Sequence, residues 1–310
     1  MRRLVALFAA CGSAPLAFAQ PPAPPVFGAR VESVYVDVFV TRDGQAVRGL
    51  TASDFELKDD GVVRTIELVG GDQVPLLAVL AFDASASVAG PKVTALQAAG
   101  AAFLDGLKAG DEAALLTFND EVRWAGLPTA TKSKVKEALS GLQPRGGTAA
   151  LDALYAAITV PTSKARSLVV LFSDGEDNLS WLDEEQVRTV AERSNALIHV
   201  VGVARPAVVR VPGGALRGQS FRPSGEDPHD RALRQIAEAT GGRFWTAESP
   251  DRLRQTFAAI AEAMGHRYLL RFEPDTGRKP GWHRLELKLR DKPGRIEARR
   301  GYWVGSASTK

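Results

Sequence analysis

The chain has 310 residues, of which 45% are hydrophobic and 24% are charged, a composition typical of globular proteins. This length suits one large domain or two modest ones, with a core that needs neither disulfide bonds nor a structural metal. The formal net charge of +3 disfavours bulk electrostatic binding to nucleic acid, so no nucleic-acid partner is expected.

The N-terminus has the pattern of a secretory signal peptide over residues 1–19. Arg2 and Arg3 precede an apolar stretch, and Ala17-Phe18-Ala19 is a small-x-small cleavage site. Cleavage there removes two arginines and no acid, and it leaves a net charge of +1 and no cysteine. We therefore expect a secreted protein, periplasmic or extracellular. Two alternatives remain open, an uncleaved anchor and lipidation at Cys11, and only these would bring membrane contact.

The next segments predict a Pro-rich linker and an antiparallel β domain. Residues 20–29 contain PPAPP, which is typical of an extended tether. Residues 30–72 alternate apolar and polar side chains and carry Arg42-Asp43-Gly44 and Asp59-Asp60-Gly61 as hairpin turn signals. Residues 266–305 return to the same alternation, so both ends of the chain are predicted to build one β domain.

The segment between them, residues 73–265, has a different pattern. Continuous apolar runs at 76–82, 167–172 and 196–203 are typical of strands buried on both faces, and amphipathic helical patterns separate them. This alternation predicts an α/β fold, doubly wound, with a mostly parallel sheet and helices on both faces. The α/β unit is predicted to be inserted into the flanking antiparallel β domain.

Three polar segments stand beside these predicted strands. Asp83, Ser85 and Ser87 (DASAS) follow the first buried strand, Thr148 (GGT) opens a helix, and Asp174 (SDG) follows the second buried strand. Ligands of open α/β sheets bind outside the carboxyl ends of the strands, where these loops can converge. Taken singly, each is typical of a helix cap or a turn; the three together, each at a strand end or helix start, indicate a site.

The chemistry of these five side chains favours a hard cation. They offer two carboxylates and three hydroxyls, with no histidine or cysteine among them, so zinc and copper are poor candidates. Oxygen donors suit Mg²⁺, with Mn²⁺ or Ca²⁺ as substitutes. Two neighbouring acids also require a cation, or one of them must hold its proton to a higher pH.

The order DASAS, GGT, SDG resembles the von Willebrand factor type A (vWA) domain and its metal-ion-dependent adhesion site. The resemblance implies that Ser85 and Ser87 ligate the ion directly, that Thr148 does so in a ligand-bound state, and that Asp83 and Asp174 act directly or through water. It also implies a non-enzymatic, Mg²⁺-bridged contact with an Asp or Glu of a partner protein, in adhesion or assembly. The flanks GLTASDF and ARRGYW look similar to secreted bacterial vWA-related proteins.

A candidate partner-contact rim follows the third motif. It comprises four side chains on the predicted site edge: Glu176, Asp177, Asn178 and Trp181. The alternative interpretation is an acidic surface turn with a part-buried tryptophan. Residues 267–310 hold twelve Lys or Arg against five Asp or Glu, which fits a solvated sheet face or contact with an acidic partner.

Two other functions are weighed against this hypothesis. A haloacid-dehalogenase-like Mg²⁺-dependent phosphatase would use Asp83 as nucleophile with Asp174 and Asp177 as metal ligands, but position 85 is Ser where that family needs an aspartate general acid. A metal-free structural scaffold is the other alternative. A serine hydrolase is disfavoured because no GxSxG elbow is present.

Overall fold

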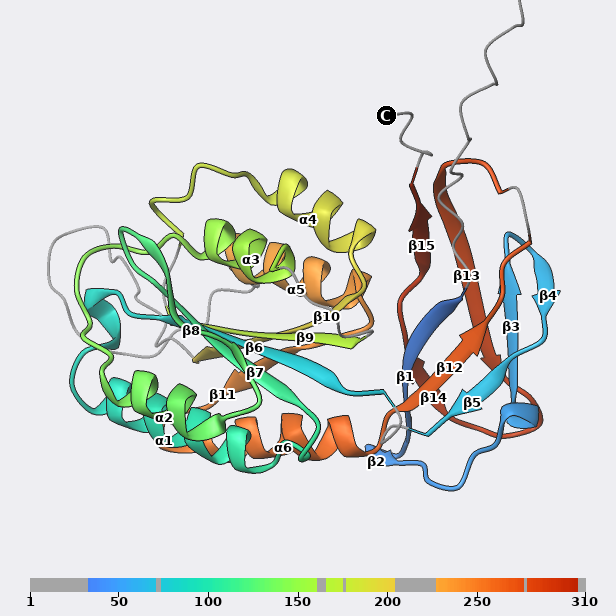
Figure 1. Cartoon of the computed structure of the whole chain (residues 1–310), viewed down its shortest axis with the longest axis horizontal. Helices are drawn as coiled ribbons and strands as arrows, with labels where there is room; N and C mark the ends of the chain where they lie inside the picture. The colour runs from blue at the N-terminus through green and yellow to red at the C-terminus, as the bar shows by residue number, and fades with distance from the viewer. Residues whose placement is uncertain are drawn as a thin grey trace, which may run out of the picture.

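A computed structural model describes residues 33–70, 74–160, 166–174, 177–203, 227–275 and 278–305. The predicted signal peptide with Cys11, the Pro-rich linker and Glu176 lie outside the described residues. The described chain forms an α/β part and a β-sandwich that lie side by side (Figure 1).

The α/β part is built on one six-stranded sheet with the order β11-β10-β9-β6-β7-β8. All neighbours are parallel except β7 and β8, and Pro128 in β8 is compatible with its place at the edge. Every residue of β6 is buried, as its continuous apolar run predicts. The strands are β6 (Leu76–Asp83), β7 (Glu112–Phe118), β8 (Val122–Thr129), β9 (Arg166–Ser173), β10 (Ala196–Val203) and β11 (Phe244–Ala247).

Helices cover both faces of this sheet (Figure 1). One face carries α1 (Pro91–Asp105), α2 (Lys132–Ser140) and α6 (Leu253–Gly265). The other carries α3 (Ala150–Ile158), α4 (Glu184–Arg193) and α5 (Pro228–Ala239). Phe82 of the sheet packs edge-on against Phe257, with ring centroids 5.5 Å apart, and ties the first helix layer to the strands. The doubly wound α/β prediction is confirmed.

The β-sandwich combines both ends of the described chain. One sheet has the order β14-β1-β12-β5 with β2 on β1, and the other has the order β15-β13-β3-β4. Both mix early and late strands, so the α/β part is inserted into an antiparallel β domain as predicted. The exact boundaries at 72/73 and 265/266 stay a prediction. The strands are β1 (Val34–Arg42), β2 (Gln45–Ala46), β3 (Phe55–Asp59), β4 (Val62–Arg64), β5 (Glu67–Val69), β12 (Tyr268–Phe272), β13 (Gly281–Leu289), β14 (Arg295–Glu297) and β15 (Gly301–Val304).

The two parts meet at the amino ends of the parallel strands. Arg166, the first residue of β9, donates to Asp37 of β1 at 2.7 Å. Arg267 donates to the carbonyl oxygens of Asp37 at 3.2 Å and Gly241 at 3.0 Å. On the sandwich side, Arg299 donates to the carbonyl of Ser194 at 2.8 Å. This junction leaves the carboxyl ends of the strands on the side away from the sandwich (Figure 1). None of the described helices is long and apolar enough to cross a bilayer.

A buried histidine lies close to this junction. The Nδ1 of His199 accepts hydrogen bonds from the backbone of Arg243 at 3.0 Å and from Trp245 Nε1 at 3.2 Å. Burial lowers the pKa of His199 to about 3, and the positive charges of Arg267 and Arg243 add to the effect. The ring is therefore neutral in the folded protein at ordinary pH, and it belongs to the core.

We predict that His199 makes the fold acid-sensitive. His199 binds a proton near pH 6.5 in the unfolded chain and only near pH 3 in the folded chain. The free energy of unfolding therefore decreases as the pH falls from 6.5 toward 3. Between pH 6.5 and about pH 5 the loss is about 2 kcal/mol. Urea denaturation at both pH values measures it, and His199→Gln should lose less. An equal acid loss in both proteins would contradict the assignment.

Candidate functional site

The polar loops meet because the register of β6 and β9 is fixed. The two strands are parallel neighbours, with Phe82 opposite Phe172. Asp83 ends β6 and Ser173 ends β9, with Asp174 directly after it. Residues far apart in sequence therefore emerge at the same edge of the sheet, outside the carboxyl ends of its central strands.

Asp83 is fully buried and is held by both of its oxygens. Oδ1 accepts from the backbone N–H of Ser85 at 2.8 Å, and Oδ2 accepts from the Ser173 hydroxyl at 2.9 Å. Burial raises the pKa of the Asp83 carboxyl; hydrogen bonds from Ser85 and Ser173 oppose the rise, and the negative Asp174 adds to it. The ionised form of the Asp83 carboxyl would therefore be stabilised by a nearby cation.

A chain of hydrogen bonds joins the first motif to the third. The hydroxyls of Ser85 and Ser87 are 2.9 Å apart, and Ser87 Oγ donates to Asp174 Oδ1 at 2.6 Å. The 3-10 helix Ala86–Val88 sets this spacing, because it turns the chain directly after Ser85. Hydrogen bonds thus link both serines and both aspartates at one edge of the sheet.

Thr148 joins the cluster through its loop. Its backbone N–H donates to Asn178 Oδ1 at 2.9 Å, and its carbonyl accepts from the backbone of Asn178 at 3.0 Å. On the other side, the backbone N–H of Arg145 donates to the Ala84 carbonyl at 2.8 Å, and the backbone N–H of Ala86 donates to the Gly146 carbonyl at 3.1 Å. The second loop is therefore tied to both of the others, and Thr148 is buried between them.

The two glycines of GGT allow the loop to pack closely against neighbouring side chains. Gly146 has φ +71°, and a Cβ there would clash with the Asp120 carboxylate. A Cβ on Gly147 would lie 2.6 Å from Leu179 Cδ1 and 2.9 Å from Asn178 Oδ1. Asp120 also accepts from the Gly147 backbone at 2.5 Å. Asp120 is thus a loop-fixing residue that the sequence motifs did not indicate.

Lys92 is a site residue that the sequence analysis missed. It lies in the first turn of α1, and its Nζ is 2.5 Å from Asp174 Oδ2 and 3.1 Å from the Ser87 carbonyl oxygen. Asp174 therefore contacts a hydroxyl on one oxygen and an ammonium on the other. The available signal was a lysine placed at a helix N-terminus, where a positive charge is unfavourable.

The described rim residues divide into two groups. Asp177 Oδ2 accepts from the Leu151 backbone at 2.8 Å and from the Ser180 hydroxyl at 2.6 Å, so it fixes the start of α3. Asn178 holds Thr148, as described above. Trp181 is 95% exposed, and its backbone is anchored by Asp152 at 3.0 Å. Of these three, Trp181 is the side chain directed into solvent.

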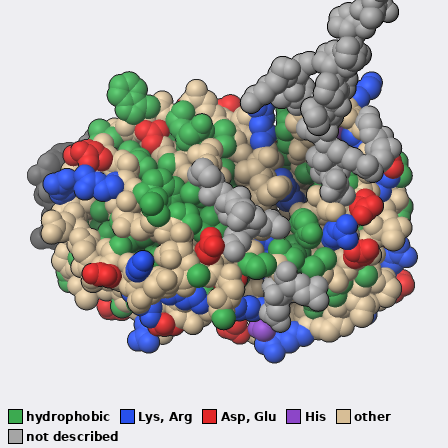
Figure 2. Space-filling view, in the orientation of Figure 1, with side chains coloured by type: hydrophobic (Ala, Val, Ile, Leu, Met, Phe, Trp, Pro, Cys, Tyr) green, Lys and Arg blue, Asp and Glu red, His purple; other side chains and the backbone are tan. Residues whose placement is uncertain are grey.

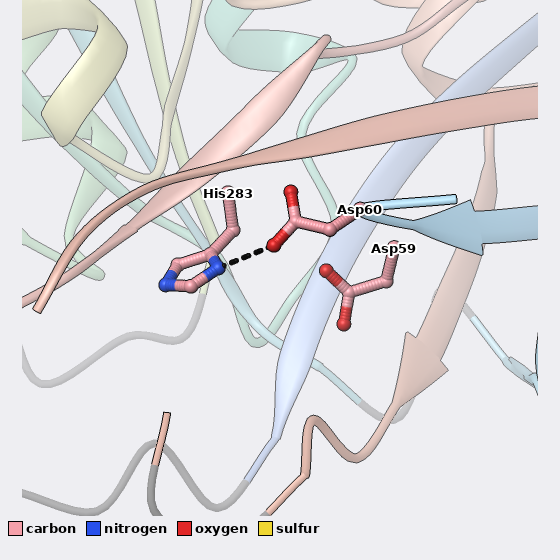
Figure 3. A group of neighbouring side chains, drawn as sticks. All are labelled: Asp59, Asp60 and His283. Carbon is pink, nitrogen blue, oxygen red and sulfur yellow. Dashed lines mark hydrogen bonds and ion pairs between the residues drawn. The ribbon is translucent and has the colours of Figure 1, made fainter. Parts of the chain in front are cut away.

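A second acidic group lies in the β-sandwich, where Asp59, Asp60 and His283 place ligand atoms within 4.8 Å of one another (Figure 3). The carboxylates are already paired. Asp59 Oδ2 accepts from Arg64 at 3.2 Å and from Arg278, and Asp60 Oδ2 lies 2.8 Å from Arg278 and 2.7 Å from His283. Arg64 and Arg278 already pair with these carboxylates, and Arg64 also pairs with Asp275. The group therefore fits a structural ion network along the sheet of β3, β4 and β13 rather than a cation site.

The donor set of the sheet-edge cluster does fit a hard cation. Its side chains present carboxylate and hydroxyl oxygens, which Mg²⁺, Mn²⁺ and Ca²⁺ prefer. The ammonium of Lys92 against Asp174 is an independent sign that positive charge is stabilised at this position. The chemistry of the cluster is that of cation binding, with no positioned imidazole or thiol in its described part.

A doubly wound α/β domain with these three loops at its sheet edge defines a class of ligand-binding domain, and the sequence comparisons name the family. The family model "von Willebrand factor type A domain" matches residues 79–259, more than half of the chain. The chain belongs to the von Willebrand factor type A family. The predicted resemblance is confirmed.

Relatives share part of their length with this chain. Inter-alpha-trypsin inhibitor heavy chain H2 of Sus scrofa is 30% identical over 131 residues, which cover 38% of this chain and 14% of that protein. A UPF0353 protein of Mycolicibacterium gilvum is 24% identical over 189 residues, covering 58% and 56%. The chain therefore spans less than two thirds of the curated relatives it matches.

Solved structures include chains of similar fold. Proximal thread matrix protein 1 from the mussel byssus, solved with a zinc-occupied MIDAS motif, aligns with a TM-score of 0.50 and 19% identity. The alignment covers 66% of this chain and 49% of that one. At this identity the likeness shows the fold alone.

We predict that Asp83→Asn stabilises the metal-free fold. The substitution keeps the side-chain shape and removes one of two neighbouring buried charges, so the melting temperature in EDTA should rise by about 2–4 °C. Asp174→Ala should lower it, because Lys92 and Ser87 lose their shared acceptor. Circular dichroism melts compare the three proteins. A lower melting temperature for Asp83→Asn than for Asp174→Ala would contradict this account of the charges.

Proposed function

We propose that this vWA protein is a non-enzymatic, metal-dependent protein-binding module. Five side chains would hold the ion: Asp83, Ser85, Ser87, Thr148 and Asp174. Mg²⁺ is the proposed ion, with Mn²⁺ or Ca²⁺ as substitutes. The observation that carries the proposal is the hydrogen-bonded link from Ser85 through Ser87 to Asp174 beside the buried Asp83.

The partner is proposed to present an Asp or Glu. Three of the five donors are neutral hydroxyls, and the resemblance allows the two aspartates to act through water. Where the hydroxyls are the direct ligands, the protein leaves much of the divalent charge of the ion unneutralised. The bound ion supplies an electrophilic position that attracts a carboxylate from another protein. The residues of this chain fix that position, because each of the three loops is bonded to the other two.

The exposed rim supports a protein partner. Trp181 is 95% exposed and Leu179 is 44% exposed, and both belong to the segment that Asn178 and Asp177 hold against the site. Hydrophobic side chains also gather over the approach to α4 on the face seen in Figure 2. Tryptophan is enriched among residues that dominate binding energy, so Trp181 is the proposed anchor beside the metal contact.

The proposed location is secreted, periplasmic or extracellular. Its support is the signal-peptide pattern of residues 1–19, which lie outside the described part of the chain. A bacterial envelope protein that acts in adhesion or in the assembly of a complex fits this location.

Metal titration tests the proposal most directly. We expect Mg²⁺ or Mn²⁺ to raise the melting temperature of the wild-type protein relative to EDTA. A metal concentration about one hundred times the Kd adds about 2.7 kcal/mol to the free energy of unfolding. Asp83→Ala should abolish the shift. Absence of a shift in the wild type, together with no binding by calorimetry, would favour the metal-free scaffold. Hydrolysis of an aryl phosphate that depends on Asp83 would instead favour the phosphatase.

A pull-down from an envelope fraction tests the partner. Capture should require Mg²⁺, fail in EDTA and fail with Asp83→Ala. Trp181→Ala should weaken binding of the captured protein about tenfold or more, without a change in melting temperature, because the side chain is nearly fully exposed. Leu127→Ala is the matched control, since Leu127 is 69% exposed near the end of β8 that pairs with the start of β7. Equal weakening by both variants would contradict the rim assignment.

A further inference from the structure

The contact between Lys92 and Asp174 has the geometry of an internal counter-ion. The Asp174 side chain is fully buried, whereas the Lys92 side chain is 35% exposed and reaches in from the first turn of α1. Nζ lies 2.5 Å from Asp174 Oδ2 and 3.1 Å from the carbonyl of Ser87, the last residue of DASAS. The ammonium thus contacts two of the residues proposed to surround the metal.

This placement is not what helix formation favours. Lys92 follows Pro91 at the start of α1, and the unpaired N–H groups there make the helix N-terminus positive. A lysine at this position is repelled by the helix and must be held by something else. The negative charge of Asp174 provides that attraction, and Lys92 in turn neutralises a carboxylate that is removed from water.

We propose that Lys92 competes with the divalent cation for Asp174, so that metal binding requires displacement of the lysine ammonium from the site. The inference rests on the proposed metal site and adds its regulation. Asp174 cannot serve both cations well, because an ammonium and a divalent ion at the same carboxylate repel each other. Lys92 therefore lowers metal affinity and stabilises the metal-free protein.

The displaced ammonium stays at the site edge. The lysine is tethered to the first turn of α1, whose start lies directly beside the DASAS loop. Once released from Asp174, the Lys92 ammonium lies on the side of the site from which the partner's carboxylate approaches. The exchange thus turns a lysine that pairs with Asp174 into one that favours an acidic partner once metal is bound.

Calorimetric titration with Mn²⁺ and Mg²⁺ tests the competition. The purified chain is compared as wild type, Lys92→Met and Lys136→Met. Lys136 is a matched control, since it is also 35% exposed and lies 2.5 Å from a carboxylate, that of Asp105, away from the site. Lys92 makes a charge-assisted hydrogen bond to Asp174, and its loss predicts metal binding about tenfold tighter or more for Lys92→Met. Lys136→Met should bind as the wild type does.

A second measurement uses the wild-type protein and avoids any folding defect of a variant. Lys92 is acylated with an amine-reactive reagent and quantified by mass spectrometry in EDTA and in saturating Mg²⁺. Metal should increase Lys92 labelling several-fold and leave Lys136 labelling unchanged. Unchanged or lower labelling of Lys92 in the metal-bound protein would overturn the exchange.

The outcomes separate this inference from the proposed function. Equal metal affinity in wild type and Lys92→Met, or weaker affinity in the variant, overturns the competition while the metal site stands. Metal binding that is measurable for Lys92→Met and not for the wild type supports the competition, because the lysine then excludes the metal. If wild type, Lys92→Met and Asp83→Asn all fail to bind metal, the proposed metal site is wrong, and the proposed competition is wrong with it.

Discussion

The site depends on one electrostatic constraint, which is that two aspartates end up together at the buried edge of a sheet. The parallel register of β6 and β9 places Phe82 opposite Phe172, so Asp83 and Asp174 emerge side by side. Each is removed from water, and burial together with the negative charge of Asp174 raises the pKa of Asp83. The serine hydroxyls, the glycine loop and Lys92 are arranged around these two carboxylates. The hydroxyls and the lysine ammonium donate to them and so offset part of the cost of burying them.

The two ends of the α/β sheet carry opposite arrangements of charge. At the amino ends, arginines such as Arg166 and Arg267 bind Asp37 and backbone carbonyls of the junction, and they fasten the β-sandwich to the sheet. At the carboxyl ends, acids and hydroxyls gather without guanidinium partners among their described contacts. The sandwich therefore anchors one end of the vWA domain and leaves the other end accessible to a partner.

The sequence predicted the parts of the fold that follow from local pattern. The fully apolar runs indicated β6 and β9, and the DASAS, GGT and SDG motifs indicated which residues meet at the sheet edge. β8 was missed, because it is an exposed edge strand with a proline and little apolar signal. Lys92 and Asp120 were missed because their roles depend on the turn at 86–88 and on the approach of two loops, which no single stretch of sequence encodes. The network of Asp59 with Arg278 likewise joins residues far apart along the chain.

Lys92 also bears on what kind of metal site this fold can support. A structural metal contributes folding energy outright, and its removal unfolds the domain. Here the sheet buries two large hydrophobic clusters, one on each face, and the lysine already balances Asp174. The fold therefore does not depend on a divalent ion to balance Asp174, whereas the ionised form of the buried Asp83 still gains from one. Under the proposed exchange, loading the site replaces one cation by another at Asp174, and such an exchange suits the proposed reversible binding of a partner's carboxylate.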